Sequence, residues 1–333
     1  MAENTVKKIA TRESYGNSLK ELAEEFPNLV VLDADLAAAT KTGIFRKAYP
    51  DRHIDCGIAE SNMMGVAAGL SLVGKIPFVS SFAMFAAGRA FEQVRNSIGY
   101  PHLNVKIGAT HAGITVGEDG ATHQCNEDIA LMRTIPGMVV MCPSDDVEAR
   151  AAVRAALEYE GPVYIRFGRA AVPVINDHPG YHFEIGKGTV VREGKDVTIV
   201  ATGICVDSAL GAAKMLEEEG ISAEVVNICT IKPLDEEIII NSAKKTGKVV
   251  TVEEHSVIGG LGSAVCDCLC ANHPVPVKKV GMQDVFGESG SAAALVEKYG
   301  LDAKGVYTAA KGRISDVMLD RLALTPQRIE AMA

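Results

Sequence analysis

The chain has 333 residues, of which 47% are hydrophobic and 23% charged, and its formal net charge is −9. This is the composition of a folded globular protein, with room for about two domains of ordinary size. The acidic balance argues against a nucleic-acid-binding surface, which is normally basic.

Membrane and secretion signals do not stand out in the sequence. No window approaches the roughly 20 consecutive apolar residues that a membrane span needs, and residues 1–8 lead into polar sequence rather than a signal peptide. We therefore expect a cytoplasmic protein without membrane contact, whose eight cysteines are free thiols.

The first half of the chain alternates between helical and strand-like segments. Helices are predicted for residues 12–25, 60–73, 84–98, 126–134 and 145–159. Strands are predicted for residues 29–35, 76–82, 105–109, 138–142 and 163–167. Short apolar strands that alternate with helices predict an α/β fold, with a parallel sheet flanked by helices. Ligands of such sheets bind beyond the carboxyl ends of the strands.

A Pro-, Asn- and Gly-containing segment, residues 173–188, is predicted to be a linker between two domains, 1–172 and 189–311. The second domain repeats the α/β alternation. Its predicted strands are 196–200, 223–227 and 248–252, and its predicted helices are 206–219, 235–245 and 261–271.

The last residues, 312–333, are predicted to form a helical tail whose role the sequence leaves open. Ile314, Met318 and Leu322 recur on one helix face, and Thr325-Pro326 has the form of a new helix start.

The segment 110–124, from here on "the 110–124 loop", concentrates the polar chemistry of the chain. Its glycines permit sharp turns, so that His111, Glu118, Asp119 and His123 are free to converge on one ligand. Three interpretations stay open for this loop by itself. It is an ordinary polar loop, a contact for a polyhydroxylated or anionic substrate, or a metal site.

Glu60 begins the predicted helix 60–73, which carries almost no charge and contains Gly65 and Gly69. One interpretation is an acid that the helix dipole favours at the first turn. The other is a buried carboxylate, which must be paired or protonated and is then a candidate for proton transfer.

Two further features lie at predicted strand ends. Phe82 and Phe85 form either a stacking platform or part of the core. Arg166, in Tyr164-Ile-Arg-Phe-Gly-Arg, suits a phosphate or carboxylate, and the alternative is a surface ion pair.

Several motifs in chain order carry a family resemblance. They are Asp33-Ala-Asp-Leu-Ala, Gly57-Ile-Ala-Glu-Ser-Asn, Ser81-Phe-Ala-Met-Phe, Thr110-His, Gly117-Glu-Asp-Gly-Ala-Thr-His-Gln and Pro143-Ser-Asp. This order resembles the C-terminal half of the transketolase family of thiamine-diphosphate enzymes, over about residues 5–310. The resemblance implies a pyrimidine-binding domain that binds thiamine diphosphate, followed by a transketolase C-terminal α/β domain.

One family motif is missing. Family members bind the cofactor's diphosphate and Mg²⁺ through Gly-Asp-Gly…Asn in an N-terminal domain, and no Gly-Asp-Gly occurs here. The resemblance is therefore to the B subunit of a split transketolase. It implies an N-terminal partner subunit that holds most of the Mg²⁺ contacts, no metal ligands on this chain, and an α₂β₂ heterotetramer.

The resemblance implies roles for the cofactor-binding residues. Glu60 corresponds to the glutamate that hydrogen-bonds N1′ of the aminopyrimidine. Phe85, with Phe82 nearby, corresponds to the ring that stacks on the pyrimidine, while Asp35 and Leu36 correspond to neighbouring cofactor contacts.

It also implies roles for the substrate-binding residues. His111 and Arg166 correspond to sugar-phosphate contacts. Asp119 corresponds to the residue that recognises a substrate hydroxyl, and His123 to the catalytic histidine near the reacting carbon. Many transketolases have Pro-Ser after Asp-Leu-Ala, and that serine contacts the substrate phosphate. This chain has Ala38-Ala39-Thr40 instead, and whether Thr40 takes over stays open.

The implied activity is the transfer of a two-carbon ketol unit between sugar phosphates, as in the pentose phosphate pathway. The alternatives are a 1-deoxyxylulose-5-phosphate synthase, the β subunit of a 2-oxo acid dehydrogenase, and a non-catalytic homologue. The paired His111 and His123 favour transketolase over the dehydrogenase, and the presence of Glu60 favours a catalytic role.

Overall fold

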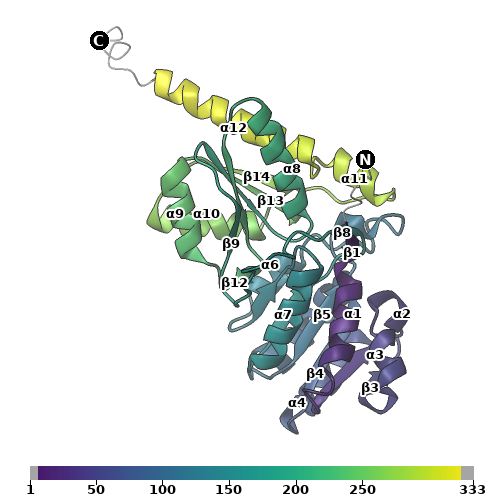
Figure 1. Cartoon of the computed structure of the whole chain (residues 1–333). Coiled ribbons are helices and arrows are strands. Elements are labelled where there is room, and N and C mark those ends of the chain that lie inside the picture. Colours follow the sequence, from purple (N-terminus) through teal and green to yellow (C-terminus); the bar gives the residue numbers. More distant parts are fainter. Residues whose placement is uncertain (1–6, 324–333) are drawn as a thin grey trace.

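The computed structural model describes residues 7–323, and its side chains as far as residue 314. Figure 1 shows two α/β domains, one above the other, with the last helix lying across the far end of the second domain. The predicted two-domain α/β fold with mainly parallel sheets is confirmed.

The first domain is built on a seven-stranded sheet in the order β12-β6-β7-β5-β4-β2-β3. Its strands are β2 (Leu29–Asp33), β3 (His53–Asp55), β4 (Ile76–Phe82), β5 (Lys106–Thr110), β6 (Val139–Met141), β7 (Val163–Arg166) and β12 (Thr230–Lys232). All neighbours pair in parallel except β12, which is antiparallel to β6. Five of the strands, β2, β4, β5, β6 and β7, are buried along their whole length, as expected for a parallel sheet covered on both faces.

Helices cover the two faces of this sheet with separate apolar clusters. On one face, Tyr15, Phe45 and Val153 belong to the cluster that packs α1 (Thr11–Leu22), α3 (Gly43–Ala48) and α7 (Asp146–Glu158). On the other face, α4 (Glu60–Leu72) and α6 (Asp128–Arg133) share a cluster that continues into the second domain at Leu261 and Val265. The two domains are therefore joined by continuous core packing. The short elements of this domain are α2 (Ala37–Thr40), η1 (Pro50–Arg52), η2 (Met84–Arg89), α5 (Phe91–Gln93), η3 (Val94–Gly99) and η4 (Ile114–Val116).

The second domain holds a five-stranded sheet in the order β14-β13-β10-β11-β9, with only β9 antiparallel. Its strands are β9 (Thr189–Arg192), β10 (Val197–Ala201), β11 (Ala223–Asn227), β13 (Val249–Ser256) and β14 (Val277–Met282). Its helices are α8 (Cys205–Glu218), α9 (Glu236–Thr246), α10 (Leu261–Asn272), α11 (Ala292–Lys298) and α12 (Ala303–Ala323). Val306 and Ala310 of α12 share an apolar cluster with Val206 and Ala213 of α8, which fixes the start of α12 to the domain.

Several details differ from the sequence-based expectations. The predicted tail boundary at residue 312 falls inside the continuous helix α12, while Thr325-Pro326 lies outside the described residues. The predicted helix 84–98 is divided into the π-helices η2 and η3 around the short α5. Strands β1 (Lys8–Ala10) and β8 (Ala171–Pro173) form a separate antiparallel pair, and β12 of the second half joins the first sheet.

Within the described part of the chain, no helix combines the length and the apolar character needed to cross a membrane. All eight cysteines are free thiols, and Cys125, Cys142, Cys205, Cys229 and Cys268 are buried.

Candidate active site

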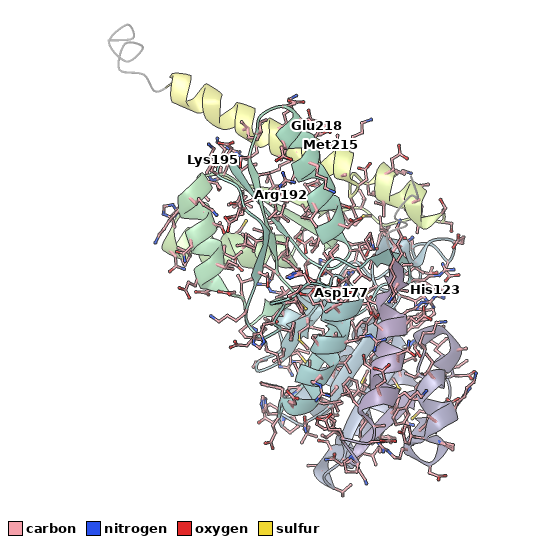
Figure 2. All side chains as sticks on the ribbon, viewed as in Figure 1. His123, Asp177, Arg192, Lys195, Met215 and Glu218 are labelled. Atoms are coloured by element: carbon pink, nitrogen blue, oxygen red, sulfur yellow. The ribbon has the colours of Figure 1, made fainter. Side chains whose placement is uncertain are left out.

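The candidate site lies where the carboxyl ends of neighbouring strands meet. Strands β5, β4, β2 and β3 are adjacent in that order, so their ends bring Thr110, Phe82, Asp33 and Asp55 to one edge of the sheet. The 110–124 loop follows β5 and turns towards the second domain, where Figure 2 labels His123 at the junction of the two domains.

Glu60 occupies the first position of α4 and is only 1% exposed. Its Oε2 atom accepts a hydrogen bond from Nη1 of Arg89 at 2.8 Å, and its Oε1 atom accepts a longer one from Oγ of Ser81 at 3.4 Å. Both sequence-based interpretations of Glu60 therefore apply together: the carboxylate stands at a helix N-terminus and is also buried and paired.

An aromatic cluster lies beside this carboxylate. The rings of Phe82 and His111 stack with their centroids 3.9 Å apart, and Phe85 lies 6.0 Å from Phe82. The edge of His123 meets Phe85 at 5.3 Å, and the guanidinium of Arg89 lies over the ring of Phe85 at 4.6 Å. Phe82 is buried and Phe85 half-buried, so the pair forms a wall that is anchored in the core and open on one side.

His111 is 3% exposed and has a φ of 55°, a left-handed conformation that is costly for a residue other than glycine. Nε2 of its ring lies 3.2 Å from Nη1 of Arg12, and Nδ1 lies 2.9 Å from Oγ1 of Thr110. A guanidinium only donates hydrogen bonds, so Nε2 accepts and the proton is assigned to Nδ1. Burial, aided by the charges of Arg12 and Arg169, lowers the pKa of His111 to about 3.

We therefore expect His111 to stay neutral across the physiological range. In an NMR titration of histidine-labelled chain from pH 8 to pH 5, its ring signals should not shift, whereas an ordinary histidine titrates near 6.5. The spectrum of the variant His111→Gln identifies the signals. A titration midpoint between pH 5.5 and 7.5 would contradict the assignment.

The same lowered pKa predicts how stability depends on pH. Between pH 3 and 6.5 His111 is protonated in the unfolded chain but neutral in the folded chain. The free energy of unfolding therefore falls as the pH falls. From pH 7 to pH 5 this loss is about 2 kcal/mol in the wild type. The variant His111→Gln should lack it, so the difference in the free energy of unfolding between the two proteins should change by this amount.

The remaining predicted cofactor residues lie near β2. Asp35 is exposed, has a φ of 60°, and its backbone N–H donates to Oδ1 of Asp55 at 3.1 Å. The backbone N–H of Leu36 donates to Oδ1 of Asp33, whose other oxygen lies 2.7 Å from Nε2 of the buried His53. These contacts fix the turn after β2 and leave the Asp35 carboxylate at the surface.

Asp119 and His123 lie further along the 110–124 loop. Asp119 is exposed between Gly117 and Gly120, which both have a positive φ, while His123 is half-buried and contacts Oγ1 of Thr122 through Nδ1 at 2.9 Å. The ring of His123 thus lies beside Phe85, and the loop leaves the carboxylate of Asp119 exposed.

Arg166 is not placed as the sequence suggested. It is 4% exposed, its Nε atom pairs with Asp128 at 2.9 Å, and its Nη2 atom donates to the carbonyl oxygens of Cys125 and Glu254. A sugar phosphate would have to displace these buried partners to reach it. The predicted substrate contact of Arg166 does not fit this geometry, because the guanidinium is already used to hold the two domains together.

Two arginines that the sequence analysis did not single out, Arg169 and Arg12, do lie at the site. Nη1 of Arg169 donates to the carbonyl oxygen of Val116 and to Oε2 of Glu118, the latter at 2.9 Å. Arg12 contacts His111 and also donates to the carbonyl oxygen of Ala39 at 2.8 Å. Arg169 belongs to the same Tyr-Ile-Arg-Phe-Gly-Arg motif as Arg166. The motif therefore predicts an arginine at the site, but it does not indicate which of its two arginines lies there.

The hydroxyl of Thr40 does not face the site. Thr40 is fully buried, and its Oγ1 atom contacts the carbonyl oxygen of Leu36 at 3.0 Å and the hydroxyl of Thr42 at 2.9 Å. It therefore holds the short helix α2 together and does not fit the phosphate contact considered for it.

Over the described residues, no group of three or more His, Cys, Asp or Glu side chains is arranged to hold a metal ion. In the 110–124 loop, His111 and His123 pack against phenylalanine rings and Glu118 pairs with Arg169. This arrangement favours the substrate-contact interpretation of the loop over the metal interpretation.

Comparisons with known proteins agree on one family. The family described as "Transketolase, pyrimidine binding domain" matches residues 7–174, and "Transketolase, C-terminal domain" matches residues 186–306. A putative transketolase C-terminal section from Methanocaldococcus jannaschii is 52% identical over 89% of this chain and 93% of its own length. A 6-deoxy-6-sulfo-D-fructose transketolase subunit from a Clostridium species is 50% identical over 90% of this chain and 92% of its own length.

A solved structure is similar over nearly its whole length. It is described as a split gene transketolase, inactive beta4 tetramer. It is 58% identical to this chain, has a TM-score of 0.85, and is matched over 93% of this chain and 99% of its own.

Proposed function

The chain belongs to the transketolase family as a C-terminal subunit of the split type, and from this premise we propose that it transfers a two-carbon ketol unit between sugar phosphates. In this proposal it acts with thiamine diphosphate and only together with an N-terminal partner subunit. The observation that carries the proposal is the buried carboxylate of Glu60 beside the half-open ring of Phe85.

These residues fit the pyrimidine half of thiamine diphosphate. A flat aminopyrimidine needs an aromatic face and a carboxylate that can accept a hydrogen bond from a protonated ring nitrogen. Phe85 offers the face, and Glu60 offers an Oε1 atom that accepts a long hydrogen bond, 3.4 Å, from Ser81. Asp35 and Leu36, at the turn after β2, would border the ring, and Phe82 would support Phe85 from the core.

When bound, thiamine diphosphate supplies the nucleophilic carbon that takes up the two-carbon unit. In the proposal, Glu60 holds a proton at the pyrimidine nitrogen N1′ and so controls the proton state of the ring. In the proposal His123, whose ring lies 5.3 Å from that of Phe85, is the second catalytic residue and would act near the reacting carbon.

The 110–124 loop and the residues around it would bind the substrate. The neutral His111 offers hydrogen bonds rather than charge, and Asp119 is exposed to accept one from a substrate hydroxyl. Arg169, whose side chain is 37% exposed, takes the anion-binding place that Arg166 does not fit, and Arg12 adds a second positive charge.

The proposal assigns most contacts to the diphosphate and its Mg²⁺ to the partner. Exposed side chains at the rim of the site support the partner requirement. Ile58, two residues before Glu60, is 76% exposed, and the side chain of Arg89 is 50% exposed. An apolar side chain at the rim of the site suits coverage by another subunit, as in an α₂β₂ assembly.

The function is tested by offering the assembled enzyme a panel of donors. With the partner, thiamine diphosphate and Mg²⁺, we expect a two-carbon unit to pass from a ketose phosphate such as xylulose 5-phosphate to an aldose phosphate. Release of carbon dioxide from pyruvate instead, with or without transfer of the remaining two-carbon unit to an aldose phosphate, would contradict the proposal and favour the synthase or dehydrogenase activity. The variant Asp119→Ala should lower the rate most for donors with the preferred hydroxyl configuration.

A further inference from the structure

The end of strand β13 in the second domain touches the 110–124 loop of the first. Oε1 of Glu254 accepts a hydrogen bond from the backbone N–H of Thr115 at 2.7 Å. Thr115 lies in η4, the turn that connects His111 to Asp119, and both Glu254 and Thr115 are buried. A buried backbone N–H needs a partner, and this carboxylate from the other domain supplies it.

Gly113 makes the contact sterically possible. Its φ is +75°, and a Cβ atom added to it would lie 2.4 Å from Cδ and from Oε1 of Glu254. The loop backbone therefore lies directly against the carboxylate, and a larger residue at this position would push the two apart.

The same end of β13 also holds the returning part of the loop. Nη2 of Arg166 bridges the carbonyl oxygens of Glu254 and Cys125, at 2.7 and 3.2 Å. The backbone N–H of Ser256 donates to the carbonyl oxygen of Asn126 at 2.8 Å. Glu254 is thus the one side chain in this group of contacts that reaches the middle of the loop, while the others fix its far end.

We infer that Glu254 is a positioning residue, which sets the 110–124 loop so that Asp119 and His123 face the sugar phosphate. The second domain then takes part in substrate recognition without touching the substrate. The kinetic consequence rests on the proposed function, whereas the contact with Thr115 is a property of this chain alone.

The preceding residue offers a matched control. Glu253 is on the same strand and equally buried, but it accepts its hydrogen bonds from the backbone N–H groups of Leu261 and Gly262, at 2.6 and 2.8 Å, within its own domain. Removing either carboxylate leaves buried N–H groups without an acceptor, so loss of stability alone cannot distinguish the two residues. The location of the lost protection from exchange does distinguish them.

The first arm of the test is amide hydrogen exchange on the isolated chain. In Glu254→Ala we expect exchange at Thr115 to be at least about tenfold faster, with Leu261 and Gly262 unchanged. In Glu253→Ala we expect the reverse. Unchanged exchange at Thr115 in Glu254→Ala would overturn the inference, whatever the enzyme's activity.

The second arm measures kinetics in the assembled enzyme. Glu254→Ala should raise KM for the sugar phosphates by about tenfold, with half-saturation by thiamine diphosphate within twofold of wild type, and Glu253→Ala should leave both KM values unchanged. Equal kinetic effects of the two variants would overturn the positioning role. A wild-type assembly without ketol transfer would instead refute the proposed function and leave the exchange result to decide on Glu254.

A milder variant covers the case in which Glu254→Ala does not fold. Glu254→Asp keeps the charge beside Arg166 but withdraws the carboxylate from Thr115 by about one methylene length. We expect faster exchange at Thr115 and a raised KM, with Glu253→Asp as its control. Wild-type exchange and KM in Glu254→Asp would contradict the inference.

Discussion

Replacing Glu60 by glutamine is expected to lower kcat of the assembled enzyme by about 10²–10⁴-fold, the range that a positioned acid–base group contributes. Glutamine keeps the size of the side chain and can still accept from Arg89 through its amide oxygen. It cannot carry the negative charge that holds a proton at the pyrimidine nitrogen. The loss should therefore appear in catalysis and not in folding.

The measurement is kcat at saturating thiamine diphosphate, with thermal unfolding of the isolated chain alongside. Glu92→Gln is the control, because Glu92 is an exposed acid that accepts hydrogen bonds from its neighbours Gln93 and Asn96. We expect wild-type rates for Glu92→Gln. Wild-type rates for Glu60→Gln would refute the role assigned to Glu60.

Replacing Arg166 by methionine is expected to lower the free energy of unfolding by about 3–5 kcal/mol, the usual cost of removing one partner of a buried ion pair. Asp128 is fully buried, and without Arg166 its charge is left with the hydroxyl of Tyr164 as its remaining side-chain partner. The bridge from Arg166 to Glu254 is lost as well. Urea unfolding of the isolated chain measures the effect.

Arg169 provides the matched comparison, because it lies three residues later and its side chain is 37% exposed. Arg169→Met should change the free energy of unfolding by less than about 1 kcal/mol, as for other exposed ion pairs, but should raise KM for the sugar phosphates. If Arg166→Met instead raised KM and left unfolding unchanged, Arg166 would be the substrate contact that its motif first suggested.

The parts of this structure that local sequence patterns determine were predictable. The bounds of β4, and of α4 within one residue, follow from apolar runs that end at polar or glycine-containing turns, and they place Phe82 and Glu60 correctly. Parallel strand order then brings the residues after β2, β4 and β5 together, because the carboxyl ends of adjacent parallel strands share an edge.

Other features depend on contacts between distant segments, which no local pattern records. Strand β12 comes from the second half of the chain but joins the first sheet. Arg166 is buried and contacts Asp128 and Glu254 rather than solvent. Strand β13 was expected as an apolar strand, and the contacts of its polar end with Gly113 and Thr115 join segments that are far apart in the sequence. The segment 84–99 contains the two π-helices η2 and η3 in place of one α-helix, and the sequence shows no evident local cause for them.

We propose that this chain carries half of an active site and needs a second polypeptide to complete it. The most direct measurement compares ketol transfer from xylulose 5-phosphate to ribose 5-phosphate by the chain alone, by the N-terminal partner alone, and by their mixture, each with thiamine diphosphate and Mg²⁺. We expect activity only in the mixture, rising with added partner until the two subunits are equimolar. Full activity of the chain alone would contradict a divided active site.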